Sequence, residues 1–163
     1  MILNNYWNWI KNIQQHANGS SGQYETFRNI TGGYNTVNFG GTNSYYVSNY
    51  SLANDAFARF GSSTTEPSAS DYCLADDITA NITNSSLSYA FECNNNIKRT
   101  LLISGHNSGA NEITIRQVGI GKQLSYGGSD TKASFLFAVC VLSTPLTVPS
   151  GSDFAITLEW VES

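Results

Sequence analysis

The sequence predicts an all-β protein: an antiparallel β-sandwich of jelly-roll or Greek-key type that carries a short helical arm at its N-terminus. From residue 45 to the end, short apolar runs alternate with turns rich in Gly, Pro, Asn and Ser. Aromatic residues make up 12% of the chain and charged residues only 12%, a composition that favours a folded core over disorder. Two packed antiparallel sheets explain such runs better than a helical fold does.

The helical arm is predicted over residues 1–16. Apolar residues recur there at intervals of three and four, and Asn18-Gly19 then provides a stop signal. A helix of this kind either packs on its own domain or docks into a neighbouring subunit. We predict that its apolar side chains bind a partner: Ile2, Leu3, Tyr6, Trp7, Trp9, Ile10 and Ile13.

Residues 17–44 are expected to form a Gly- and Asn-rich connection, because they show no helical period. Four apolar side chains in it could belong to a loose hairpin or could line a contact surface: Phe27, Tyr34, Val37 and Phe39.

Residues 45–163 are predicted to form the β-sandwich domain. A loop around Pro67 and a turn over residues 104–111 separate some of its runs. The expected strands cover residues 45–50, 56–61, 72–79, 86–93, 97–103, 112–120, 134–142 and 154–160.

The most apolar segment of the chain is Ser134–Leu142, which we predict to be a central strand covered on both faces. The following "STPLTVPSG" is expected to be a turn and an edge segment, because its two prolines cannot donate ladder hydrogen bonds. In the last strand, alternation places one set of apolar residues on a common face: Phe154, Ile156, Leu158 and Trp160.

The chain contains three cysteines, an odd number. Cys73, Cys93 and Cys140 each lie in an apolar run, and no pair has the spacing of metal ligands. Three buried free thiols are the favoured interpretation, with one disulfide or a metal site as alternatives. Free thiols point to assembly in a reducing cytoplasm.

Charge argues against direct binding to nucleic acid, since the net charge is −4 and the eight basic residues are scattered. The first residues lack the basic region and continuous apolar core of a signal peptide, and Ser134–Leu142 is too short to cross a bilayer. We therefore expect neither secretion nor membrane insertion.

No residues form a recognisable catalytic motif, and we expect no enzyme activity, cofactor or metal. His16 and His106 lack a neighbouring nucleophile motif. Asp71, Asp76 and Asp77 are interpreted as surface or capping carboxylates, with a calcium site as the lesser alternative.

Aromatic residues leave a carbohydrate-binding module open as a rival function, because exposed rings can serve as platforms for sugars. The candidates for such a platform are Tyr45, Tyr46, Tyr50 and the three tryptophans.

An ordered series of segments resembles a family of structural proteins from bacteriophage virions. It comprises "GSSTTEPSASDYCLADDI", "HNSGANEITIRQVGI" and "FLFAVCVLSTPLTVPSGSDFAITLEW", and spans Phe60 to Trp160. The family typically reads G-x-G-x-T-x-P-x-x-x-D-Y-x-L, then N-x-x-x-x-x-I-T-I-x-E-V-G-L, then L-x-A-R-x-V-L-x-x-P-V-x-V-P-x-G. The opening "LNNYWNW" is also similar to the start of structural proteins from gut phages.

Two positions depart from this pattern: Gln117 replaces the usual Glu, and Val139 replaces the usual Arg. If those residues normally form an ion pair, loss of both avoids an unpaired buried charge. The resemblance implies an oligomeric accessory protein of the head, neck or tail of a tailed phage. Its expected partners are other virion proteins, its expected location is the virion, and it would assemble in the bacterial cytoplasm.

Overall fold

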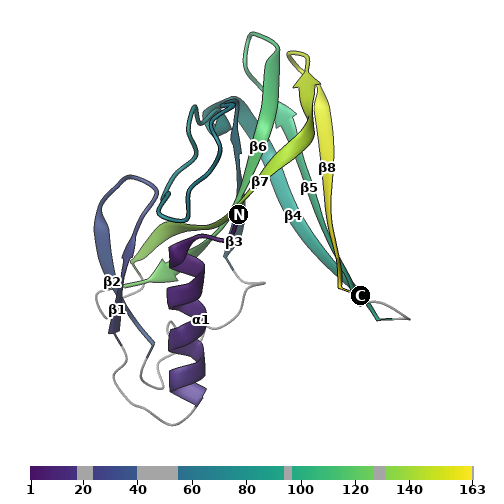
Figure 1. The fold of residues 1–163 in the computed structure, drawn as a ribbon. Coiled ribbons are helices and arrows are strands. Elements are labelled where there is room, and N and C mark those ends of the chain that lie inside the picture. Colours follow the sequence, from purple (N-terminus) through teal and green to yellow (C-terminus); the bar gives the residue numbers. More distant parts are fainter. Residues whose placement is uncertain (18–23, 40–54, 94–96, 127–130, 163) are drawn as a thin grey trace.

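The computed structural model describes residues 1–17, 24–39, 55–93, 97–126 and 131–162, and these consist mainly of antiparallel strands with one helix (Figure 1). The predicted all-β class with a short N-terminal helix is confirmed. The elements are α1 Asn4–Ala17, β1 Tyr24–Arg28, β2 Tyr34–Asn38, β3 Ala56–Gly61, β4 Ile82–Cys93, β5 Ile97–Asn107, β6 Ile113–Ser125, β7 Lys132–Val148 and β8 Asp153–Glu162, with a 3₁₀ turn at Thr79–Asn81.

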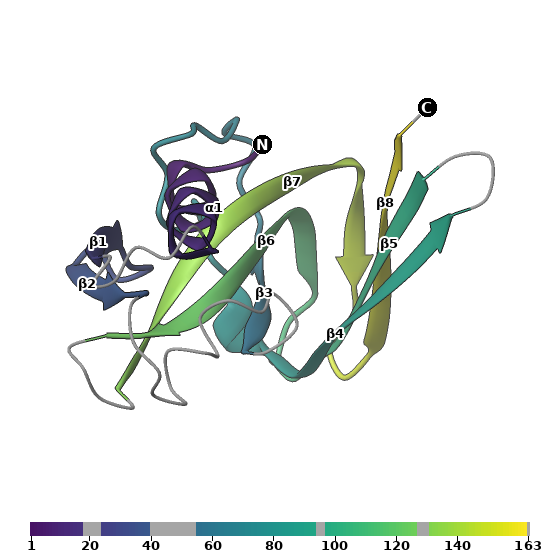
Figure 2. The same ribbon diagram turned by 90° about the horizontal axis from the view of Figure 1, so that it is seen from below.

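The described strands form two three-stranded sheets and a separate hairpin. The sheet orders are β3-β6-β7 and β4-β5-β8, and β1 pairs with β2. The two larger sheets approach each other at the top of Figure 1 and diverge below, and Figure 2 shows α1 lying across β7. The architecture is therefore sandwich-like.

The main core joins the two larger sheets. Alternation along β5 and β8 directs Ile103 and Ile156 inward, and the rings of Phe60 and Phe154 meet edge to face with centroids 5.3 Å apart. The predicted inward face of the last strand is confirmed for Phe154, Ile156 and Leu158; the side chain of Trp160 lies outside the described residues.

A second core lies under α1 and the hairpin. It contains Trp9 from the helix, Phe27, Val37 and Phe39 from the hairpin region, and Leu124, Phe135 and Phe137 from β6 and β7. Within the predicted connection, the hairpin alternative is confirmed for Tyr24–Arg28 and Tyr34–Asn38, with Tyr34 on the exposed face; residues 18–23 and 40–44 lie outside the described part of the chain.

One expected strand is wrong. Residues 72–79 form a loop with a single bridge between Gly61 and Asp77, followed by the 3₁₀ turn. Asp76 adopts a φ of 48°, in the left-handed region. Because that conformation is incompatible with an extended ladder, the apolar run cannot continue as a strand. The expected strand at 45–50 lies outside the described residues.

The prediction for β7 needs two corrections. Among the described strands, β7 lies at the edge of its sheet rather than at the centre, and it continues through Pro145 to Val148. The pairing changes from Gln117–Val141 to Ile115–Leu146, so residues 142–145 bulge opposite Arg116. A bulge on an edge strand accommodates proline, because no ladder donor is needed there.

Candidate partner-binding surface

The first three residues run along the outer edge of β7. The Leu3 amide donates to the Phe137 carbonyl at 2.8 Å, and the Val139 amide donates to the Met1 carbonyl at 2.9 Å. The Met1 ammonium group donates to the Val139 carbonyl at 2.7 Å. An unpaired strand edge invites association with other chains. Here the chain's own N-terminus closes part of that edge.

Asn5 fastens the start of α1 to two other elements. Its side chain is 8% exposed, and its amide nitrogen donates to the carbonyl oxygens of Arg28 at 2.9 Å and Leu136 at 3.2 Å. The Ile30 amide donates to the Ser134 carbonyl at 3.0 Å. The N-terminal segment, the hairpin and β7 are thereby linked by hydrogen bonds.

Five of the seven side chains predicted to bind a partner pack within the chain itself. Leu3 and Trp9 are buried, and Tyr6, Ile10 and Ile13 are partly buried against the core under α1. The Trp9 ring lies 5.4 Å from that of Phe137, measured between centroids. The two alternatives for the helix were packing on its own domain and docking into a neighbouring subunit. In the structure, these five side chains pack on their own domain.

The other two predicted residues face outward. Trp7 is 58% exposed, and Ile2 is 38% exposed next to Met1 at 57%. We call these three residues the N-terminal rim. Among the described residues, the Trp7 ring contacts one other ring, that of Tyr6, edge to face with centroids 5.5 Å apart. A large exposed indole is a typical anchor in protein interfaces. Ile2 and Trp7 are therefore the predicted partner-binding residues that stay exposed, and Met1 adds to them in the rim.

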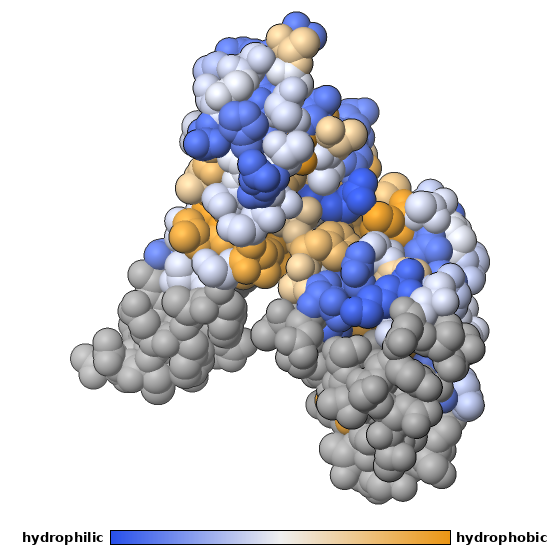
Figure 3. Space-filling model, turned by 180° about the vertical axis from the view of Figure 1, so that it is seen from behind, coloured by the Kyte–Doolittle hydropathy of each residue, from blue (hydrophilic) through white to orange (hydrophobic). Residues whose placement is uncertain are grey.

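Apolar residues also gather where the two larger sheets diverge, in the notch seen from behind (Figure 3). Partly buried Leu87, Ile120 and Leu158 belong to the margin of the core that joins these sheets. Of these three side chains, Leu158 is the one that alternation placed on the apolar face of the last strand.

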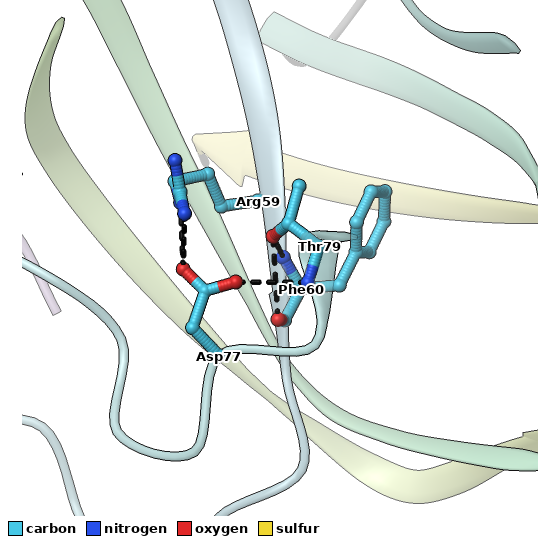
Figure 4. Close-up of polar contacts among 4 residues, drawn as sticks. All are labelled: Arg59, Phe60, Asp77 and Thr79. Atoms are coloured by element: carbon cyan, nitrogen blue, oxygen red, sulfur yellow. Dashed lines mark hydrogen bonds and ion pairs between the residues drawn. The ribbon is translucent and has the colours of Figure 1, made fainter. Parts of the chain in front are cut away.

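The loop that carries Asp71, Asp76 and Asp77 is fastened to β3 through Asp77 and Thr79. Arg59 donates to Asp77 Oδ2, and Thr79 exchanges hydrogen bonds with the backbone of Phe60 through its hydroxyl group (Figure 4). Asp77 Oδ1 also accepts from the Thr79 amide at 2.8 Å. Within the described residues no group of three or more His, Cys, Asp or Glu side chains is placed to hold a metal ion.

Asp71 caps a turn in the same loop. Its Oδ2 accepts from the Ser68 amide at 2.7 Å. This contact fits the predicted capping role.

His106 contacts Asp153 across β5 and β8, with its Nδ1 2.7 Å from the carboxylate oxygen. The Asp153 side chain is 89% exposed, so the pair lies on the surface. The side chain of His16 lies outside the described residues.

Cys73 and Cys140 are free thiols, as expected, but both are partly exposed rather than fully buried. Burial raises the pKa of Cys140, and this effect exceeds the opposing influence of the nearby N-terminal ammonium group. The side chain of Cys93 is not among those described. In the part of the chain that the structure describes, no helix is long and apolar enough to cross a membrane.

Comparisons with protein-family models, curated protein sequences and solved structures gave no match.

Proposed function

We propose that the chain is a structural component of a tailed bacteriophage virion, an oligomeric accessory protein of the head, neck or tail. The observation that carries this proposal is the ordered series of phage-like segments between Phe60 and Trp160. Its expected location is the virion, after assembly in the bacterial cytoplasm.

The places of these segments in the fold support the proposal. The "GSSTTEPSASDYCLADDI" segment starts at the end of β3, and the second and third segments supply β6 and β7 of the same sheet. The third segment then continues into β8 of the other sheet. Gln117 of β6 donates to the Thr65 carbonyl at 2.5 Å, which ties the first segment to the second. The resembling segments therefore meet in one structural unit.

The two departures from the family pattern also meet. Gln117 pairs with Val141, and Val139 pairs with Gly119. Gln117 and Val139 are consequently diagonal neighbours on one face of the sheet. Both are buried, so a lone charge at either position would carry a large desolvation penalty. Replacing both the Glu and the Arg of an ion pair avoids leaving one buried charge without its partner.

Docking to other virion proteins is assigned to the N-terminal rim. The rim offers the exposed indole of Trp7 and the exposed side chains of Met1 and Ile2, and apolar anchor residues of this kind lower the desolvation cost of an interface. A second copy of the chain and the neighbouring virion subunits are the proposed partners.

The test is incorporation into particles. Phage particles from cells that express the tagged full-length chain are purified by density gradient and their protein content is measured by mass spectrometry. The wild-type chain is expected in stoichiometric amounts. Its absence from particles that contain the other structural proteins would contradict the proposal.

Two variants separate the function from the docking site. Trp7→Ser removes the exposed rim indole, whereas Leu102→Ser changes another exposed side chain, 45% exposed on β5. We expect Trp7→Ser to reduce incorporation by about tenfold, the effect of losing an interface anchor, and Leu102→Ser to be neutral. Equal incorporation of both variants would refute the rim while leaving the virion assignment intact.

A further inference from the structure

The outer face of the β1–β2 hairpin carries an arrangement that the proposed function does not use. Alternation puts Phe27 and Val37 in the core and leaves six side chains on the opposite face. They pair across the strands as Tyr24–Asn38, Thr26–Thr36 and Arg28–Tyr34. Tyr24 is 63% exposed and Tyr34 is 69% exposed, so two aromatic rings flank a row of hydroxyl groups.

Arg28 supplies a positive charge at one end of this face. Its guanidinium carbon lies 3.6 Å from the ring centroid of Tyr72 and 5.8 Å from that of Tyr34. Its Nε donates to the Gly32 carbonyl at 3.3 Å. Among the described residues, no carboxylate pairs with Arg28. The stacked guanidinium group therefore keeps its terminal NH₂ groups as donors for a ligand.

The hairpin holds this face in a fixed shape. Asn29 Oδ1 accepts from the amides of Thr31 and Gly33, both at 3.0 Å. The side-chain nitrogen of Asn29, Nδ2, also donates to Asn35 Oδ1 at 2.6 Å. Since the turn is fastened by its own hydrogen bonds, little conformational entropy is lost when a ligand binds.

We propose that this hairpin face binds an acidic saccharide, a sugar that carries a carboxylate group. The carboxylate accepts two hydrogen bonds from the terminal nitrogens of Arg28, a geometry suited to the planar guanidinium fork. The C–H face of the pyranose ring stacks on Tyr34, because the tyrosine ring has a negative face. The hydroxyl groups of Thr26 and Thr36, 3.2 Å apart, bond to the sugar hydroxyls.

The length and charge of the surface favour a short oligosaccharide. Five residues of extended strand cover about 13 Å, so the ring of Tyr24 is within reach of a further sugar unit. The net charge of −4 disfavours general attraction of polyanions, and binding therefore depends on the specific pairing with Arg28. This proposal is independent of the virion assignment.

The test is calorimetric titration of the purified chain with oligogalacturonate, its methyl ester and dextran sulfate oligosaccharides, which carry sulfate groups but no carboxylate. We expect oligogalacturonate to bind with a Kd of about 1 mM or tighter and the methyl ester to bind at least about tenfold more weakly, because it lacks the charge-assisted hydrogen bonds. No binding of oligogalacturonate, or equal binding of the ester or of dextran sulfate, would overturn the proposal.

Variants locate the site. Arg28→Gln and Tyr34→Ala should each weaken oligogalacturonate binding by about tenfold, whereas Tyr34→Phe, which keeps the ring, should stay within about twofold. Arg116→Gln, on β6, is the matched control for loss of one positive charge. Thermal unfolding checks that Arg28→Gln is folded, and Arg28→Lys provides a second test with intermediate affinity expected. Equal loss in Arg116→Gln, or no loss in Tyr34→Ala, would contradict the assignment.

Discussion

Replacement of Asn5 by alanine tests the junction of helix, hairpin and sheet. The change deletes two hydrogen bonds, at 2.9 and 3.2 Å, and leaves the carbonyl groups of Arg28 and Leu136 without this donor. Each buried bond contributes about 1 kcal/mol, and an unsatisfied partner raises the cost. We expect the free energy of unfolding to fall by about 2 kcal/mol. For a chain of this size, that corresponds to a decrease in Tm of about 4–8 °C.

Thermal unfolding followed by circular dichroism measures this change, and two further variants sharpen it. Asn4→Ala is the matched control, because Asn4 is exposed and its replacement should change stability by less than about 0.5 kcal/mol. Asn5→Asp keeps the shape but turns donors into acceptors that face two carbonyl groups, so it should be less stable than Asn5→Ala at neutral pH. Similar Tm values for Asn4→Ala and Asn5→Ala would refute the reasoning.

Three further changes test other parts of the fold by urea unfolding. Gly121→Ala places a methyl group 2.5 Å from the carbonyl oxygen of Phe135 and should cost about 1–3 kcal/mol; unchanged stability would contradict the close approach. Asp77→Asn retains the acceptor for the Thr79 amide and should cost less than about 1 kcal/mol, whereas Asp77→Ala loses both contacts and should cost about 1 kcal/mol more. Burial lowers the pKa of Lys122 from 10.5 to about 8, so the unfolded chain binds more protons between these pH values. Stability relative to a Lys122→Met variant should therefore rise by about 1–3 kcal/mol across that window, and a flat difference would count against the lysine's burial.

Period-2 alternation made the later strands predictable. Ile113 and Ile115 in β6, and Phe154 and Ile156 in β8, lie inward as their spacing indicates. Alternation alone could not distinguish a central from an edge position for β7. The apolar run Ser134–Leu142 is buried partly by α1, and its outer edge is paired with the first residues of the chain rather than with another strand of the sheet. Distant pairing of this kind leaves no local signal.

For the apolar side chains of residues 2–13, the sequence left open whether they pack on their own chain or on a partner. An apolar helix face looks the same whether it packs on its own chain or on a partner, and the difference depends on tertiary contacts. Asn5 gave no signal, because a polar residue near a helix start is ordinary on a solvated surface. The stacking of Arg28 on Tyr72 likewise joins residues far apart in the sequence.

Amide hydrogen exchange of the intact chain tests most directly whether the N-terminus belongs to the fold. The amides of Leu3 and Val139, which bond across the edge of β7, should be protected like those within the sheet, and their protection should not change with protein concentration. Exchange at the rate of exposed amides, or protection that appears only at high concentration, would contradict an N-terminal segment that closes its own sheet.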